Sequence, residues 1–204
     1  MRAIALILPL AAAAALAGCA SSRDTAEAAT GTPAPARHAK PAPAPTIGGA
    51  VLDASDTIAA NIVKAPNLTT LVGALRAAGL EPTLAAAGPY TLFAPTNDAF
   101  GRLAPGTVET LLKPENKPSL VKLLDYVIVA GRVTTADLRE RIKAGGGSAT
   151  LSSVEGDPLT VTLTGDVLTL TDVNGNRSYI QTGDVPQGNG VIQVVNGVLI
   201  PDLG

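Results

Sequence analysis

The sequence predicts an α+β fold for residues 50–204, on three observations. In the first half of this segment, helix caps, prolines and apolar residues at i, i+3, i+4 and i+7 indicate amphipathic helices. In the second half, apolar residues alternate with threonines at period two, and turn residues separate the runs. Helices followed by antiparallel strands are typical of the α+β class. The segment is about 155 residues long, which is enough for one domain with its own core.

Polar caps or prolines begin most of the expected helices. Pro118 fits the first turn of a helix that runs to Tyr126, because the N–H that proline lacks has no helical partner there. Gly79 is a natural stop for the second helix. The expected helices cover residues 57–64, 68–78, 82–87, 97–103, 108–112, 118–126 and 136–143. Five of them have predicted N-caps, at Asp56, Asn67, Thr96, Thr107 and Thr135.

Strands are expected wherever β-branched and aromatic residues gather between turn signals. Tyr90–Ala94 is such a run, and Pro95 stops it because proline gives no N–H to a ladder. Gly165-Asp166 is a two-residue turn, so residues 159–163 and 167–171 should form a hairpin. Further strands are expected at residues 127–129, 178–182 and 191–195.

Residues 1–18 are expected to be a lipoprotein signal peptide. The apolar run of residues 3–16 is shorter than the roughly 20 residues that a spanning helix needs. A tetrapeptide that resembles a bacterial lipobox follows, Leu16-Ala17-Gly18-Cys19. The small residues Ala17 and Gly18 suit recognition by a signal peptidase, and the Cys19 thiol would take the lipid. A plain secretory signal with a cysteine near its cut is the alternative.

Residues 19–49 are expected to be a lipidated cysteine followed by a disordered tether. Alanine and proline dominate this stretch, and it has too few large apolar residues to offset chain entropy. Extended at ~3.1 Å per residue, it would hold the domain up to ~90 Å from the lipid. The residue directly after Cys19 is Ala20 and not an aspartate, which favours the outer membrane of the cell envelope if the source is Gram-negative. The sole histidine, His38, is expected to be solvated here.

The composition of the domain excludes several function classes. Residues 50–204 hold 11 Lys/Arg and 15 Asp/Glu, a net charge of 11 − 15 = −4, and no basic stripe that would favour nucleic acid. They contain neither histidine nor cysteine, so imidazole or thiolate chemistry and metal sites built on those groups are excluded. We therefore expect no cofactor, no metal and no enzyme activity, although a Ser–Lys pair or paired carboxylates stay open.

Two motifs resemble the signatures of the fasciclin (FAS1) family. Residues 90–100 form a strand, a proline, a cap and a helix, and residues 189–201 resemble the second signature. The resemblance implies a compact wedge, with an antiparallel β-sandwich-like core and helices packed along one edge. The residues that carry it are Phe93, Ala94, Pro95, Thr96, Asn97, Phe100, Tyr126, Asn189, Gly190, Val191, Ile192 and Gln193.

The sequence departs from the family pattern at polar positions. After the family's tyrosine, matched by Tyr126, a histidine is usual, and Val127 stands there. Gln193 replaces a second histidine, and Asn196 replaces an aspartate. A buried polar group without a partner costs ~1–3 kcal/mol, so we expect Gln193 to keep a hydrogen-bonding role while Val127 only packs.

The resemblance implies a non-enzymatic adhesion or interaction module, acting as a monomeric domain with a protein or glycan partner in the envelope or matrix. Asp184-Val185 falls where animal relatives carry an Asp-Ile pair implicated in integrin recognition, so these two are candidate contact residues. The alternative is a periplasmic lipoprotein that binds or hydrolyses a small molecule or glycan, which would need a cleft holding carboxylates or Tyr126. An envelope scaffold without a ligand is a third reading.

Overall fold

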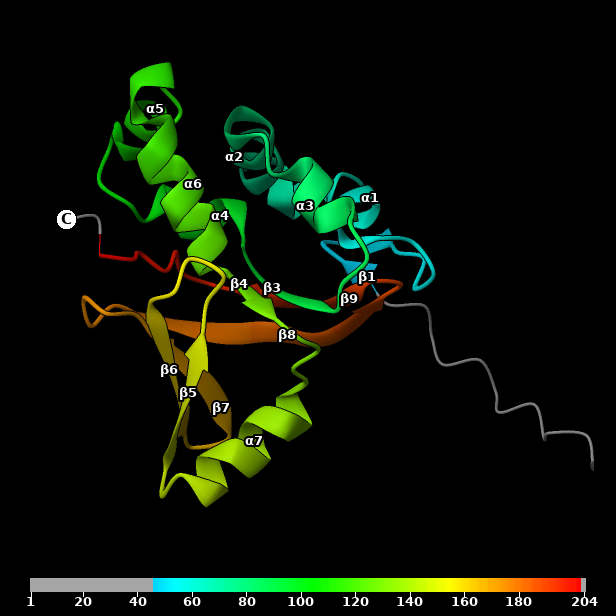
Figure 1. The fold of residues 1–204 in the computed structure, drawn as a ribbon, viewed down its shortest axis with the longest axis vertical. Helices are drawn as coiled ribbons and strands as arrows, with labels where there is room; N and C mark the ends of the chain where they lie inside the picture. The colour runs from blue at the N-terminus through cyan, green and yellow to red at the C-terminus, as the bar shows by residue number, and fades with distance from the viewer. Residues whose placement is uncertain (1–45, 203–204) are drawn as a thin grey trace, which may run out of the picture. The chain divides into compact units, whose positions relative to one another are not determined.

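The computed structural model describes residues 46–202, and this part of the chain has the predicted α+β fold (Figure 1). The predicted signal peptide and nearly all of the predicted tether lie outside the described residues. The helices are α1 (Ile58–Ile62), α2 (Thr69–Ala78), α3 (Glu81–Ala85), α4 (Asn97–Gly101), α5 (Thr107–Leu111), α6 (Lys117–Tyr126) and α7 (Thr135–Ala144), with 3₁₀ turns at Pro66–Leu68 and Pro114–Asn116. The strands are β1 (Thr46–Ile47), β2 (Ala50–Val51), β3 (Tyr90–Pro95), β4 (Ile128–Ala130), β5 (Ser148–Ser152), β6 (Pro158–Thr164), β7 (Val167–Thr171), β8 (Arg177–Gln187) and β9 (Gly190–Val195).

The folded part begins earlier than residue 50, the predicted boundary. β1 and β2 pair as a small antiparallel hairpin, and Ile47 is only 2% exposed. Gly48 and Gly49 both adopt positive φ angles in the turn between the strands. In the sequence these glycines resemble the end of a linker, but in the structure they form a turn that only glycine adopts easily.

Seven strands share one continuous order, β4-β3-β9-β8-β7-β6-β5. The long strand β8 joins two parts of this sheet: it pairs with β7 near its start and with β9 from Ile180 onward, with register shifts on either side of Thr182. The two ends of the order also meet, because Val129 of β4 forms a bridge with Ser153, just after β5. These shifts and the bridge bend the sheet around a core, which accounts for the sandwich-like form.

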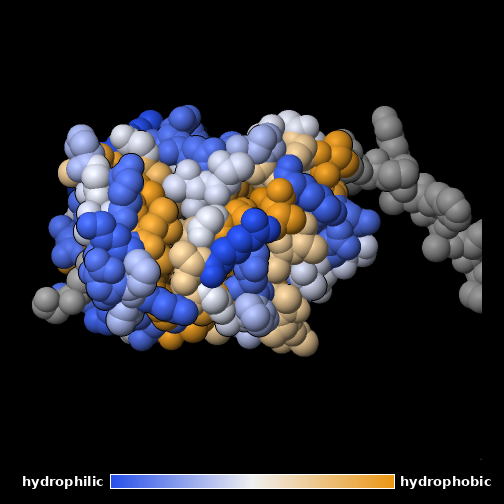
Figure 2. Space-filling model, turned by 90° about the horizontal axis from the view of Figure 1, so that it is seen from above, coloured by the Kyte–Doolittle hydropathy of each residue, from blue (hydrophilic) through white to orange (hydrophobic). Residues whose placement is uncertain are grey.

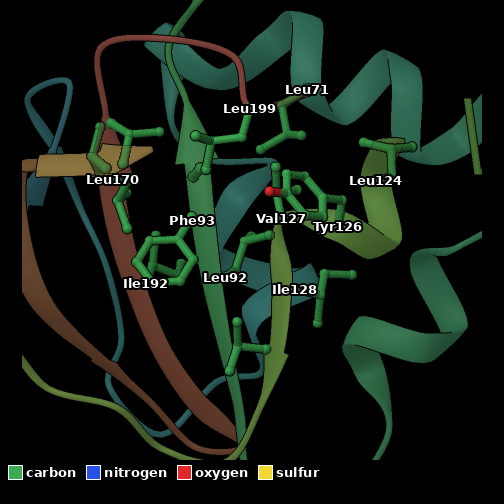
Figure 3. Close-up of a cluster of buried hydrophobic side chains, with 14 of the residues drawn as sticks. Leu71, Leu92, Phe93, Leu124, Tyr126, Val127, Ile128, Leu170, Ile192 and Leu199 are labelled. Atoms are coloured by element: carbon green, nitrogen blue, oxygen red, sulfur yellow. The ribbon is translucent and has the colours of Figure 1, made fainter. Parts of the chain in front are cut away.

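The sheet contains a parallel pair of strands that the sequence did not predict. β3 and β9 run side by side in parallel, with Phe93 opposite Gln193. Almost every residue of both strands is buried, as expected for a parallel pair covered on both faces. Figure 3 shows Phe93 and Ile192 in one cluster with Tyr126, which ends α6. The two signature motifs therefore form the middle of the core.

The helices form two separate groups. Figure 1 shows α1 to α6 together on one side of the molecule and α7 at the opposite end, where it packs against β5 and β6. The predicted helix stop at Gly79 is confirmed, with φ 80°. No helix within residues 46–202 is long and apolar enough to cross a membrane.

Several predicted helix caps are wrong. Thr57 caps α1 in place of Asp56, whose carboxylate pairs with Lys64 at 2.7 Å. Thr134 caps α7 in place of Thr135, because Asp137 reaches back and completes a capping box. Before α2 and α5 the cap positions are Leu68 and Gly106, neither of which makes a side-chain cap, so Asn67 and Thr107 do not act as predicted.

Candidate functional site: signature motifs and surface hollows

The first signature motif supplies the caps of two different helices. Thr96 caps its own helix α4, accepting a hydrogen bond from the Ala99 N–H at 3.3 Å. Asn97 accepts one from the Thr70 N–H of α2 at 3.0 Å and donates to the Pro66 carbonyl at 3.1 Å. Leu68, at the N-cap position of α2, has no polar side chain, so the capping hydrogen bond of α2 comes from Asn97 instead.

Asn189 of the second motif ties three elements together. Its side-chain oxygen accepts from the Ile58 N–H of α1 at 2.8 Å, and its amide nitrogen donates to the carbonyls of Leu84 and Ala86 at the end of α3, at 2.8 and 2.7 Å. The next residue must be glycine, because a Cβ on Gly190 would collide with the carbonyl oxygen of Tyr90 in β3. Both residues therefore hold the fold together.

Gln193 is fully buried in β9 and has the hydrogen-bonding role expected from the sequence. Its amide nitrogen donates to the Val133 carbonyl at 3.1 Å and to an Asp184 carboxylate oxygen at 3.0 Å. Its side-chain oxygen accepts from the Asp184 N–H at 3.0 Å. Val127 is also fully buried and lies among apolar neighbours, as Figure 3 shows.

Of the two candidate contact residues only Asp184 lies exposed at the surface, and its role in contact stays a prediction. Val185 is 3% exposed and belongs to the core. The Asp184 carboxylate accepts from the Thr135 N–H at 2.7 Å, at the first turn of α7, and also bonds the Thr135 hydroxyl. Asp184 adopts a positive φ of 57° in the irregular part of β8, a conformation that aspartate tolerates better than most residues. Asp184 thereby fastens β8 to α7.

Tyr126 is likewise internal. It is fully buried, and its hydroxyl donates to the Pro158 carbonyl at 3.0 Å. Burial, with the nearby carboxylates of Asp172 and Asp157 adding to it, raises the pKa of the Tyr126 hydroxyl to about 12. Burial also raises the pKa of the neighbouring Asp125 carboxyl above its ordinary value. A phenol in this state is neutral at ordinary pH and is held inside the core.

Two adjoining hollows lie around the connection between α4 and α5. They measure about 310 and 330 Å³ and share Pro105 and Gly106 in their walls. Half-buried apolar side chains line them, including Leu103, Val108 and Leu111. Figure 2 looks onto the helices and shows apolar surface in furrows between hydrophilic side chains. This part of the surface is open and partly apolar.

A third hollow, of about 260 Å³, lies where three connections meet: α3–β3, β4–α7 and β8–β9. Its lining is mostly glycine, alanine and proline, with one charged side chain, Arg132. The Arg132 guanidinium donates to the Gln187 carbonyl at 3.0 Å. Arg132 could not be predicted as a site residue from the sequence, because it belongs to no motif and becomes notable only where three distant loops meet.

The predicted lipobox, including Cys19, lies outside the described residues. Within residues 46–202, no cluster of three or more histidine, cysteine, aspartate or glutamate side chains could hold a metal ion.

The fold and its buried motifs define the class, a FAS1-type α+β domain. The solved structure of a FAS1 domain pair from the insect cell adhesion molecule fasciclin I is similar, with a TM-score of 0.62 at 16% identity, covering 73% of this chain and 51% of that one. The family model described as the fasciclin domain matches residues 66–201, so the chain belongs to the fasciclin domain family.

The relatives differ in how much of their length this chain covers. Protein sll1483 of Synechocystis sp. is 38% identical over 157 residues, which are 77% of this chain and 80% of that protein. Transforming growth factor-beta-induced protein ig-h3 of Sus scrofa is 32% identical over 147 residues, 69% of this chain but only 19% of that protein. This chain therefore resembles a part of ig-h3 and most of the cyanobacterial protein.

Proposed function

We propose that the protein is a non-enzymatic interaction module of the cell envelope. A lipid on Cys19 would anchor it to a membrane, and residues 20–45 would hold the domain away from that membrane. Two or more acyl chains, as on a diacylglyceryl cysteine, give stable anchoring. The partner would be a protein or glycan of the envelope or matrix, and in a Gram-negative cell the anchor would lie in the outer membrane.

The observation that carries this proposal is that the polar signature side chains form their hydrogen bonds inside the domain. Thr96, Asn97, Asn189 and Gln193 all bond to backbone groups or side chains inside the domain. The open surface around α4 and α5 is instead shallow and partly apolar. A surface of this kind fits contact with another macromolecule better than it fits catalysis, which needs convergent polar groups.

The similar solved structure supports the same function, since it comes from a cell adhesion molecule. The alternative of a hydrolytic lipoprotein needs Tyr126 or carboxylates in a deep cleft. Tyr126 is fully buried and lines none of the three hollows described above. Binding of a glycan, without its hydrolysis, remains compatible with the interaction module.

The proposal is tested by placing a large charge on the open surface. Ala104 is exposed and lines the first hollow, so Ala104→Arg would block contact there without disturbing the core. The matched control is Ala144→Arg, at the exposed C-terminal end of α7. Attachment of cells displaying the full chain to other cells or to deposited matrix is the measurement.

We expect Ala104→Arg to reduce attachment severalfold and Ala144→Arg to leave it unchanged, at equal display and equal melting temperature. Equal attachment of both variants and the unaltered chain would remove the α4–α5 surface from the proposal. Failure of the unaltered full chain to promote any attachment would refute the interaction function itself.

A further inference from the structure

We propose that the hollow at Arg132 binds a uronate, the carboxylate-bearing sugar unit of an acidic polysaccharide. This inference rests on the proposed function, because it names the chemistry of the partner. It differs from that proposal in its place on the molecule, since the Arg132 hollow is formed by other residues than the α4–α5 hollows.

The backbone on either side of Arg132 is fixed by hydrogen bonds. The Gly131 N–H donates to the Pro89 carbonyl at 2.8 Å. The hydroxyl of Thr91, a fully buried residue of β3, donates to the Gly131 carbonyl at 2.7 Å and accepts from the Val133 N–H at 2.9 Å. Arg132 is exposed, and the backbone of its neighbours Gly131 and Val133 is held by hydrogen bonds. Less conformational entropy of the loop is therefore lost when a ligand binds.

The guanidinium itself has capacity for a ligand. Arginine carries five N–H donors, and Arg132 is seen to use one nitrogen, toward the Gln187 carbonyl. Within residues 46–202 the ion pairs join Lys64 with Asp56, Arg76 with Glu81 and Lys122 with Glu155, so no carboxylate there neutralises Arg132. A planar fork with unpaired donors is suited to bidentate recognition of a carboxylate.

The walls of the hollow are rigid and expose backbone. A Cβ on Gly88 would collide with the Asn189 carbonyl, and a Cβ on Gly188 would collide with the Ser55 carbonyl, so both glycines lie tight against other loops. The N–H groups of Ala87 and Gly88 make no hydrogen bond to any part of the chain between residues 46 and 202. These two residues line the hollow beside the arginine.

These features together favour a sugar acid over a peptide acid. At about 260 Å³ the hollow is smaller than most ligand pockets, which measure roughly 300–1,000 Å³, so it suits one small unit. The carboxylate of a uronate would accept hydrogen bonds from the Arg132 guanidinium. Its hydroxyl oxygens would accept from the N–H groups of Ala87 and Gly88, and its apolar C–H face would pack against Pro89. One such contact is weak alone, but many anchored copies on a repeating polymer would bind by avidity.

The test is binding of the full chain, purified in detergent micelles, to tri-galacturonate by calorimetric titration. Arg132→Gln removes the charge and the fork, and Arg132→Lys keeps the charge only. The matched control is Arg139→Gln, since Arg139 also donates from its guanidinium to a backbone carbonyl, that of Asp166, at 2.7 Å but in no such hollow. Methyl-esterified tri-galacturonate and a triaspartate peptide complete the set of ligands.

We expect Arg132→Gln to weaken tri-galacturonate binding by about tenfold or more, as loss of a charge-assisted bidentate contact should. Arg132→Lys should retain part of the affinity and Arg139→Gln all of it, with melting temperatures unchanged. The methyl ester and the peptide should bind at least about tenfold more weakly than tri-galacturonate.

Three results would overturn the site. They are unchanged tri-galacturonate affinity of Arg132→Gln, an equal loss of affinity in Arg139→Gln, and no binding of tri-galacturonate by the unaltered chain. Equal or tighter binding of the triaspartate peptide would overturn the sugar class and assign the hollow to a protein partner. If the site fails while cell attachment persists, only the partner chemistry is wrong and the interaction function stands.

Discussion

Single polar residues inside this domain each satisfy backbone groups that would otherwise be unpaired. Asn97 accepts from the Thr70 N–H of α2, Asn189 joins the start of α1 to the end of α3, and Gln193 joins Val133 to Asp184. Leaving such groups unpaired in the interior costs about 1–3 kcal/mol each. The signature residues are therefore explained by folding, without a ligand.

Substitution of Gln193 by leucine should lower the free energy of unfolding by about 2–4 kcal/mol, because the Val133 carbonyl and the Asp184 N–H both lose their side-chain partner. Urea denaturation of the full chain measures this. The matched control is Gln181→Leu, on the exposed part of β8, which should change stability by less than about 0.5 kcal/mol. Equal midpoints for the two variants would contradict the role assigned to Gln193.

The pH dependence of stability should be flat near neutrality and steep in alkali. Residues 46–202 contain no histidine or cysteine, so little titrates between pH 6 and 8. The pKa of Tyr126 is raised from 10 to about 12, so stabilisation by its neutral form is complete below pH 10 and is lost as pH rises toward 12. That loss amounts to about 3 kcal/mol.

Comparison with Tyr126→Phe isolates this effect, since the two proteins differ only in the Tyr126 hydroxyl. The phenylalanine variant should be less stable at pH 8, by about 1 kcal/mol for the lost bond to Pro158, yet lose less stability between pH 10 and 12. Parallel stability curves for the two proteins over that range would show that Tyr126 does not titrate as described.

Elements with strong local signals could be predicted from the sequence, and elements defined by distant partners could not. The Gly165-Asp166 hairpin and the helix with Pro118 in its first turn are confirmed because turn and proline chemistry act locally. The parallel pairing of β3 with β9 joins segments about 100 residues apart, and no local pattern specifies it. β5 could not be predicted, although Ser148–Ser152 alternates polar and apolar residues, because it is short, follows three glycines and contains only one large apolar side chain.

The same limit applies to the candidate sites. Thr96 could be predicted as a cap from its place after Pro95, whereas the action of Asn97 on α2 depends on the tertiary approach of another helix. Asp184-Val185 was assigned from its position relative to a motif, and only the structure shows its bonds to α7. Arg132 carries no sequence signal beyond its charge.

The two caps of the first motif should have separable effects on helices. Thr96→Ala should speed amide exchange in α4, and Asn97→Ala should speed it in α2, each at a cost of about 1 kcal/mol. Hydrogen exchange read by mass spectrometry resolves the two segments. Faster exchange in α4 alone for both variants would show that Asn97 does not cap α2.

At the scale of the whole molecule, a fasciclin domain built around two buried signature strands follows a predicted lipid anchor and tether. The domain supplies a scaffold held together by these signatures, with open hollows at its surface around α4–α5 and around Arg132. The proposed tether would supply reach, because a proline-rich chain extends by about 3.1 Å per residue. Reach matters for contact with a partner but not for turnover of a diffusing substrate.

Deletion of residues 22–45 with Cys19 retained tests this account most directly, by counting attachment of cells that display the protein to other cells or matrix. The matched control replaces residues 22–45 with a Gly/Ser segment of equal length. Equal melting temperatures of the variants show that the domain is folded in each of them. We predict that the deletion abolishes attachment and that the replacement retains most of it. Attachment by the deleted form equal to that of the full chain would contradict the proposal of a tethered interaction module.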